Sequence, residues 1–399
     1  MHSIFPIHLI RKPAALLACL SLGLPFAHAV TFQISDPVEF AKIIDTNAVL
    51  TTNASGLNTW LEGPVWIPSG GYLVFCDQGN NRLKKLVPPN TLTDFLVPAA
   101  STLFNGTMLD AQERLIACEA GTAGLRVVMV TNGVVTPLCS TCNGLKFYSP
   151  NDVVVKSDGT IWFTDPGYNG VTAPPPQPGF QAGYYVYQFN PTNGNATCTP
   201  VITNGLIRPN GLCFSPDESL LYVADSDTTR HNIRVWSVSS SNTLSGGAVF
   251  ATVTNGSPDG IRCDVQGHVW SAGGDGAYIF ATDGHLVGKI GFKNVVVNFC
   301  WGGPQYKTFY MVGQPLVTSI PVLVAGEPSL KKLQYTFDGT QLNLLWPAPS
   351  TGFTLQESDQ LDASANWTNS ALAHVTNNGL NQVTVDPTND SKFFRLLLN

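Results

Sequence analysis

The stretch Asn210-Gly-Leu-Cys-Phe-Ser-Pro-Asp217, followed by Leu220-Leu-Tyr-Val-Ala-Asp225, contains the pattern that decides the fold of this chain. A polar residue beside glycine opens a short apolar run. A proline-containing turn follows, and a second apolar run ends in an acidic residue. Runs of this length, bounded by turn residues, are typical of antiparallel strands.

The same pattern occurs five more times along the chain. A third strand pattern usually follows, and no segment shows a sustained helical stripe. Repeats of about 40 to 60 residues with three or four strands each are typical of β-propeller blades. The sequence therefore predicts an all-β, six-bladed propeller over roughly residues 35–325, with a tandem sandwich array as the competing fold. The other five segments begin at Glu62, Asn105, Asn151, Asp259 and Asn298.

The six opening residues predict where the chemistry lies. Innermost strands line the channel of a propeller, so equivalent positions in successive blades converge on its axis. Each opening residue carries a carboxylate or amide oxygen, which suits Ca²⁺ and not zinc, because zinc prefers His and Cys. Asn-Gly and Asp-Gly pairs are also common in plain turns. Their recurrence at one place in six repeats favours a ring of oxygen donors at one mouth of the channel.

The N-terminus has the features of a secretory signal peptide. Arg11 and Lys12 precede the apolar run 14–26, and Ala27-His-Ala29 supplies small residues for cleavage. We expect residues 1–29 to be removed and the protein to be secreted or periplasmic; an N-terminal anchor helix is the alternative. No other run of eighteen apolar residues exists, so we expect no membrane span in the mature chain.

Composition excludes other classes of protein. The 399 residues are 44% hydrophobic and 12% charged, with a net charge of −6. Disorder needs low hydrophobicity, and nucleic-acid binding needs clustered basic residues, so neither fits. Among nine cysteines, Cys139-Ser-Thr-Cys142 is the only close pair. A local disulfide is the expectation there, because a zinc site needs a second pair and a thioredoxin-like site needs a βαβ context.

The end of the chain forms a separate unit. Short strand patterns such as Leu342–Trp346 and Phe393–Leu398 alternate with turns. We expect the propeller to occupy residues 30–328 and a small β-sandwich-like module to occupy residues 329–399. The module resembles those appended to secreted bacterial proteins, and we expect it to contact the propeller or a surface.

Four motifs resemble those of the SMP-30/gluconolactonase/LRE-like family, and the resemblance extends over most of the chain. They are Glu62-Gly-Pro-Val-Trp66, Ser149-Pro-Asn-Asp-Val153, Arg208-Pro-Asn-Gly-Leu212 and Ser257-Pro-Asp-Gly-Ile261. The resemblance implies a six-bladed propeller that holds one divalent cation in its channel, Ca²⁺ first and Zn²⁺, Mg²⁺ or Mn²⁺ as other candidates. By the family pattern the metal ligands are Glu62, Asn151, Asn210 and Asp259.

The resemblance also implies a reaction. Gluconolactonases of this family hydrolyse sugar lactones, a small-molecule substrate whose carbonyl a bound cation polarises. Asp259 is expected to act as general base or to orient the attacking water. A role as a metal ligand alone is an equally weighted alternative. Two other functions remain candidates: a phosphotriesterase-like hydrolase on the same scaffold, and a non-catalytic binding propeller with a structural calcium.

Several further residues carry expectations. Ala120 and Ser149 stand where related enzymes often have His and Arg, so a substrate other than a sugar lactone stays open. We expect His268 to be exposed, and we interpret the acidic residues at the second-strand ends as partners of backbone amides. No serine lies in a Gly-x-Ser-x-Gly elbow, so a serine hydrolase is not indicated. These strand-end acids are Asp77, Glu119, Asp165 and Asp225.

Overall fold

The computed structural model describes residues 27–28, 30–57, 60–168, 173–292, 295–326, 333–337, 340–347, 353–360, 365–377, 380–386 and 392–398. The predicted signal peptide therefore lies almost wholly outside the described residues. Its last part is the exception, because Ala27–His28 forms strand β1 against β3 (Leu50–Ala54). Cleavage after Ala29 stays a prediction.

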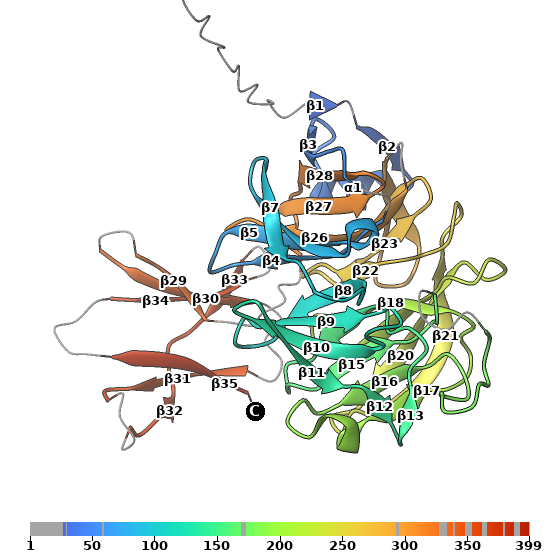
Figure 1. Ribbon diagram of the computed structural model, residues 1–399. Helices are drawn as coiled ribbons and strands as arrows, with labels where there is room; N and C mark the ends of the chain where they lie inside the picture. The colour runs from blue at the N-terminus through green and yellow to red at the C-terminus, as the bar shows by residue number, and fades with distance from the viewer. Residues whose placement is uncertain are drawn as a thin grey trace, which may run out of the picture.

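Six antiparallel sheets follow one another along the chain and form six blades (Figure 1). The first three blades are β4 (Leu61–Ile67), β5 (Tyr72–Asp77), β6 (Arg82–Val87) and β7 (Thr91–Leu96); β8 (Phe104–Leu109), β9 (Leu115–Glu119), β10 (Arg126–Thr131) and β11 (Val134–Cys139); and β14 (Val153–Val155), β15 (Ile161–Thr164), β16 (Val186–Phe189) and β17 (Thr199–Ile202). The other three are β18 (Pro209–Phe214), β19 (Leu220–Asp225), β20 (Asn232–Val238) and β21 (Leu244–Thr252); β22 (Ile261–Cys263), β23 (Val269–Gly273), β24 (Gly276–Phe280) and β25 (Leu286–Gly291); and β26 (Val296–Gly302), β27 (Thr308–Gly313) and β28 (Leu316–Pro321).

The first strand of each blade contacts the first strand of the next. The order β26, β4, β8, β14, β18, β22 returns to β26, so the inner strands form a closed ring. A tandem array of sandwiches has no such closure. The predicted six-bladed propeller is confirmed, and so are the third strands that the sequence pattern indicates.

Two N-terminal strands complete the last two blades, which the repeat pattern did not predict. Strand β3 pairs with β28 and becomes the fourth strand of blade 6. Strand β2 (Thr31–Ile34) pairs with β25 on the edge of blade 5. The first and last parts of the propeller thus share one sheet, and this pairing closes the ring.

A short helix was also missed by the periodicity. Helix α1 (Pro37–Ile43) begins with proline in its first turn, and the Asp36 carboxylate accepts hydrogen bonds from the amides of Val38 and Glu39. This is a usual N-cap arrangement, and the Asp-Pro pair is its sequence signal. Phe40 and Ile43 face inward and join the core.

Aromatic side chains fill the space between blades 5 and 6. The ring centroid of Trp270 lies 5.1 Å from that of Trp301 and 4.6 Å from that of Phe309. All three are buried. Such offset and edge contacts add to the burial of apolar area, which dominates folding energetics. The packing holds the blades in fixed positions around the channel.

The expectation that His268 is exposed is wrong. Its side chain is buried, with 4% of the residue exposed. Nδ1 lies 2.8 Å from the Asp264 carboxylate, and Nε2 lies 3.1 Å from the Glu39 carboxylate on α1. Trp270 donates to the same Asp264 oxygen. The histidine follows a turn glycine, as the sequence suggested, but the N-terminal helix covers that turn.

Replacing His268 by glutamine should destabilise the protein most at acid pH. Burial lowers the pKa of His268, but its hydrogen bonds to Asp264 and Glu39 outweigh this and raise it. A raised pKa in the folded state stabilises below the ordinary value of about 6.5, and this contribution is lost as pH rises through the folded pKa. Chemical denaturation should show a loss of about 2 kcal/mol at pH 5.5 that shrinks above pH 7. A difference that grows with pH would contradict this.

The C-terminal strands form two small sheets beside the propeller (Figure 1). Leu344, Trp346, Leu355 and Val383 form their shared apolar core, which fits the predicted sandwich-like module. The expected boundary at residues 328 and 329 lies outside the described residues. The first sheet contains β29 (Gln334–Phe337), β30 (Leu342–Pro347), β34 (Leu380–Val385) and β33 (Val375–Asn377), and the second contains β32 (Thr368–Asn369), β31 (Phe353–Ser358) and β35 (Phe393–Leu398).

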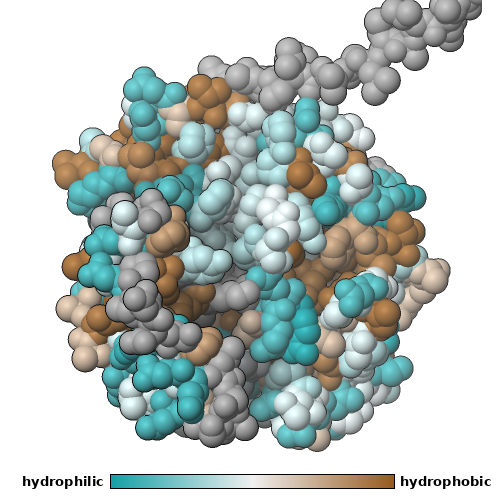
Figure 2. All heavy atoms as spheres, turned by 90° about the vertical axis from the view of Figure 1, so that its left-hand side faces the viewer, coloured by the Kyte–Doolittle hydropathy of each residue, from teal (hydrophilic) through white to brown (hydrophobic). Residues whose placement is uncertain are grey.

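The surface on this side of the molecule is mixed in character. Figure 2 shows hydrophilic and apolar groups interspersed across the visible atoms of this face. Within the part of the chain that the structure describes, no helix is long and apolar enough to cross a membrane.

Candidate active site

The six opening residues lie together at one end of the channel. Glu62, Asn105, Asn210 and Asn298 stand near the starts of inner strands β4, β8, β18 and β26. Asn151 and Asp259 directly precede β14 and β22. All but Asp259 are buried, and Asp259 is half-buried. The structure therefore brings the sequence-predicted ligands Glu62, Asn151, Asn210 and Asp259 to one mouth.

Glycines explain how neighbouring blades approach so closely here. A Cβ on Gly63 would lie 2.1 Å from the Asn105 carbonyl oxygen, and one on Gly211 would lie 2.2 Å from that of Asp259. Real Cβ atoms do not approach so closely, so only glycine fits after the polar residue. The Asn-Gly and Asp-Gly pairs are thus not merely turns.

Side-chain contacts connect members of the ring directly. The Asn298 amide donates to the Glu62 carboxylate at 3.2 Å, and Asn210 hydrogen-bonds to the Asp259 carboxylate. The Thr164 hydroxyl donates to the Asn210 carbonyl at 2.7 Å. These contacts run from blade to blade and hold the oxygen atoms toward the channel.

Negative charge is concentrated at this mouth. Burial raises the pKa of Glu62 to about 7, against the lowering effect of its hydrogen bond from Asn298. Burial, and then the charges of Glu62 and Asp152, raise the pKa of Asp259 well above its ordinary value. Three carboxylates thus act on one another, and among the described residues Arg262 is the cation that offsets them at Glu62. A divalent cation would relieve the remaining excess.

Two amide oxygens support the same conclusion. Among the described residues, the Oδ1 atoms of Asn105 and Asn210 are buried without a hydrogen-bond partner. A buried, unpaired acceptor is costly, and a hard cation satisfies it. The described residues contain no group of three or more His, Cys, Asp or Glu arranged to hold a metal ion. Because half or more of the donors here are amides, the residues present fit Ca²⁺ better than Zn²⁺.

A buried ion pair, which the motifs did not indicate, lies beneath the ring. The Arg262 guanidinium donates to the Asp152 carboxylate at 2.9 Å, which links blade 5 to blade 3. Arg262 also donates to the Ile261 carbonyl at 2.8 Å. The signal was available, because a charged residue inside the apolar strand Ile261–Cys263 requires a buried partner. Its partner lies two blades earlier in the chain and was not deducible from the sequence.

Two of the four acidic residues at second-strand ends, Asp165 and Asp225, accept hydrogen bonds from backbone amides as predicted. The other two, Asp77 and Glu119, pair instead with the side chains of Asn80 and Arg126. The Asp165 carboxylate accepts from the amides of Tyr148 at 2.8 Å and Ser149 at 2.5 Å. Asp225 accepts from the amides of Ile207 and Arg208 in the same way. Each acid therefore holds the segment that leads to Asn151 or Asn210. Burial raises the pKa of Asp165 to about 7.

The two departures from the family pattern lie against each other. The Ser149 hydroxyl donates to the Ala120 carbonyl at 2.9 Å, and both residues are buried. Ala120 follows β9 in blade 2, and Ser149 precedes β14 in blade 3. Two small residues thus close the seam between these blades.

Tyr168 and Arg208 form a wall beside Asp259. Burial and the charge of Asp259 raise the pKa of Tyr168, which also hydrogen-bonds to Ser226. The Arg208 guanidinium lies 5.5 Å from the ring centroid of Tyr168 and 4.4 Å from that of Tyr184. Tyr168 is 43% exposed, so one side of it faces solvent at the mouth. Sequence reasoning did not single out either residue of this wall.

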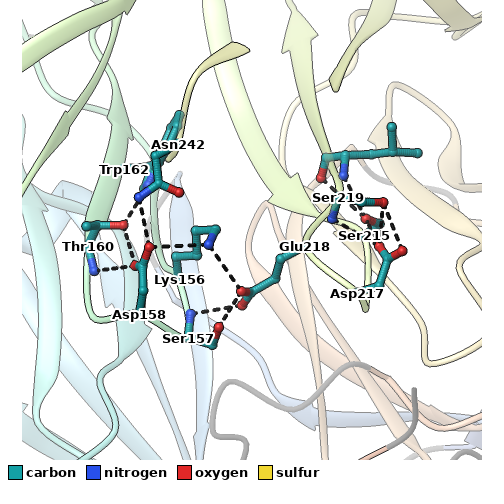
Figure 3. A network of polar contacts seen from close by, with 11 residues as sticks. Lys156, Ser157, Asp158, Thr160, Trp162, Ser215, Asp217, Glu218, Ser219 and Asn242 are labelled. Atoms are coloured by element: carbon teal, nitrogen blue, oxygen red, sulfur yellow. Dashed lines mark hydrogen bonds and ion pairs between the residues drawn. The ribbon is translucent and has the colours of Figure 1, made fainter. Parts of the chain in front are cut away.

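A cavity of about 600 Å³ lies at the other end of the inner strands and is lined by residues of blades 2, 3, 4 and 5. Its polar rim is a closed network in which Lys156 lies between Asp158 and Glu218 (Figure 3). Asp158 also accepts from Asn242 at 2.8 Å, and Glu218 accepts from the Ser157 amide at 2.9 Å. These groups join the turns of blades 3 and 4 and satisfy one another, so we assign them a structural role.

The fold and this mouth define a class: a six-bladed β-propeller whose channel ends in a ring of oxygen donors suited to a cation and a small polar molecule. The model of the SMP-30/Gluconolactonase/LRE-like region matches residues 60–314, more than half of the chain. The protein belongs to this family.

Individual relatives agree with the family assignment. The chain is 29% identical over 290 residues to a gluconolactonase of Zymomonas mobilis, covering 67% of this chain and 80% of the relative. It is 24% identical to pentonolactonase XacC of Haloferax volcanii, covering 63% and 80%. A solved gluconolactonase from Xanthomonas campestris is 29% identical with a TM-score of 0.66, covering 74% of this chain and 97% of that one.

Proposed function

We propose that this protein is an exported, metal-dependent lactonase that hydrolyses a sugar lactone or a related small lactone at the oxygen ring. Membership of the family and the gluconolactonase, lactonohydrolase and pentonolactonase relatives make it a lactone-hydrolysing enzyme. One observation carries the metal dependence: Glu62, Asn210 and Asp259 meet where carboxylates outnumber the one neighbouring cation, Arg262, and an amide oxygen is unpaired.

Glu62, Asn151, Asn210 and Asp259 are the residues that would hold the cation. When bound, a divalent cation supplies Lewis-acid stabilisation of the negative charge that develops on the lactone carbonyl oxygen. Carboxylates balance the charge, and neutral amides leave the ion electrophilic. A set of two carboxylates and two amides therefore combines affinity for the cation with a cation that still polarises the lactone carbonyl.

The side chains then have separate tasks. Asp259 is placed to accept a proton from the attacking water, because its carboxylate lies half-buried at the channel mouth and can take a proton that the neighbouring amides cannot. The hydroxide adds to the carbonyl carbon, the ring C–O bond breaks, and the released oxygen gains a proton. Tyr168 and Arg208 stand beside Asp259 and offer a phenol and a guanidinium to substrate hydroxyl groups.

Residues 1–29 support export, because a basic pair is followed by an apolar run and then by small residues suited to cleavage. The remaining chain begins close to β2, the first strand of the propeller core. A lactonase of this kind would meet its substrate outside the cytoplasm.

A panel of lactones tests the proposal. Gluconolactone, a pentonolactone and aliphatic lactones should be supplied to the purified protein with Ca²⁺, and hydrolysis followed by acid release. We expect turnover of at least one lactone, its loss with a chelator, and its recovery on adding Ca²⁺. No turnover of any lactone with the metal still bound would favour a binding propeller, and turnover of a phosphotriester alone would favour the phosphotriesterase-like reaction.

A further inference from the structure

Three cysteines from two blades meet at the outer edge of the propeller. Cys139 ends β11, and Cys142 lies on the short strand β12 (Thr141–Cys142). Cys198 follows the short 3-10 helix η2 (Gly194–Thr197) in blade 3. The Cys198 thiol hydrogen-bonds to both Cys139 and Cys142, and all three residues are buried in one core cluster.

The surrounding backbone holds these thiols in place. The Asn195 side-chain oxygen accepts from the amides of Ser140 at 2.6 Å and Thr141 at 3.1 Å, so η2 is fastened to the segment between the two cysteines. A Cβ on Gly194 would lie 2.2 Å from the Leu138 carbonyl oxygen, which shows how closely the two blades approach. The Gln181 amide donates to the Cys142 carbonyl at 2.9 Å. These backbone contacts therefore hold the three thiols close together.

The three thiols are not equivalent. The Cys139 thiol donates to the Thr141 carbonyl at 3.5 Å, within its own segment. The hydrogen bond from Cys198 lowers the pKa of Cys142, whereas contacts with Cys139 and Cys142 raise that of Cys198. Because the Cys139 thiol is already engaged within its own segment, Cys142 is the partner for Cys198 and the attacking thiol of the group.

We propose that Cys142 and Cys198 form a disulfide that cross-links blades 2 and 3, with Cys139 left as the third thiol. The oxidant is a disulfide, either a small molecule such as oxidised glutathione or a protein disulfide. The Cys142 thiolate attacks one of its sulfurs and releases one thiol. Cys198 then loses its proton and attacks the Cys142 sulfur of the mixed disulfide, which releases the second thiol. Two protein thiols are oxidised and one external disulfide is reduced.

This pairing differs from the local Cys139–Cys142 bond that the sequence suggests, and in the structure all three cysteines are free thiols. Cys142 and Cys198 are far apart in the chain, and only the fold shows that they meet. Because the bond would close a long loop, it restricts the unfolded chain more than a bond between near neighbours does. It would also anchor the segment that leads from Cys142 to Asn151 at the ring.

Peptide mapping distinguishes the pairings directly. Trypsin places Cys139 and Cys142 in one peptide, Val127–Lys146, and Cys198 in another, Ser157–Arg230, since the Arg208–Pro209 bond resists cleavage. Protein refolded with oxidised glutathione, alkylated and digested without reductant should yield these two peptides joined. The join should be lost in Cys142→Ser and Cys198→Ser and kept in Cys139→Ser. Cys213→Ser controls for the other cysteine of the second peptide, whose sulfur lies 3.7 Å from that of Cys263.

A bond confined within peptide Val127–Lys146, a join lost in Cys139→Ser, or alkylation of every cysteine would each overturn the proposal. Thermal unfolding gives a second measurement that does not depend on the enzyme reaction. Reductant should lower the Tm of the oxidised protein by roughly 5 to 10 °C and should not change that of Cys198→Ser. A Tm unaffected by reductant would also count against the cross-link.

Discussion

Replacing Asp259 with asparagine should lower kcat for lactone hydrolysis by about two to four orders of magnitude while most of the bound metal is retained. Asparagine keeps the volume and one oxygen donor of Asp259, so it is a conservative change for a ligand. It cannot accept a proton from water. Asp259 is half-buried at the channel mouth and hydrogen-bonded to Asn210, so the side chain is held at a fixed position in either form.

The measurement combines steady-state kinetics with the metal content of the purified variant. Asp227→Asn is the matched control, because Asp227 is an acid that caps Thr229 outside the ring and should leave kcat unchanged. If Asp259→Asn loses its metal and regains activity at high Ca²⁺, then Asp259 is only a ligand and the base lies elsewhere.

Replacing Arg262 with methionine should destabilise the protein by about 3 to 5 kcal/mol. The change leaves the Asp152 carboxylate buried without its cation, and its charge also acts on Glu62 and Asp259. The double variant Asp152→Asn/Arg262→Met removes both charges and should recover much of the lost stability.

Urea unfolding of the two single variants, the double variant and the parent provides the double-mutant cycle. Arg234→Met is the control, since the Arg234 guanidinium donates to the Gly247 carbonyl within its own blade and its loss should cost far less. A double variant whose loss of stability equals the sum of the two single losses would show that Asp152 and Arg262 are not coupled.

The repeats made the propeller predictable, because each blade carries its own turn and strand pattern in one continuous stretch of sequence. The ring of oxygen donors was also predictable, since equivalent positions in a propeller share one axis. Asp165 and Asp225 behave as expected because their backbone partners come from the segment that leads into their own blade.

Long-range partners account for what was missed. His268 was predicted to be exposed because its own turn is polar, and only helix α1 buries it. The Asp152–Arg262 ion pair and the contact between the Cys142 and Cys198 thiols join residues from different blades, and local pattern does not specify such contacts. Tyr168 and Arg208 reach the mouth from loops between strands, where no periodicity guides a prediction.

Strand β3 meets β28 although nearly the whole propeller sequence lies between them. During synthesis β3 is completed early, whereas its partner β28 is completed only after almost all of the blades. Contacts so distant in sequence slow folding. We therefore expect the nascent chain to stay open, and compatible with passage through a membrane pore, until its last blade has been delivered.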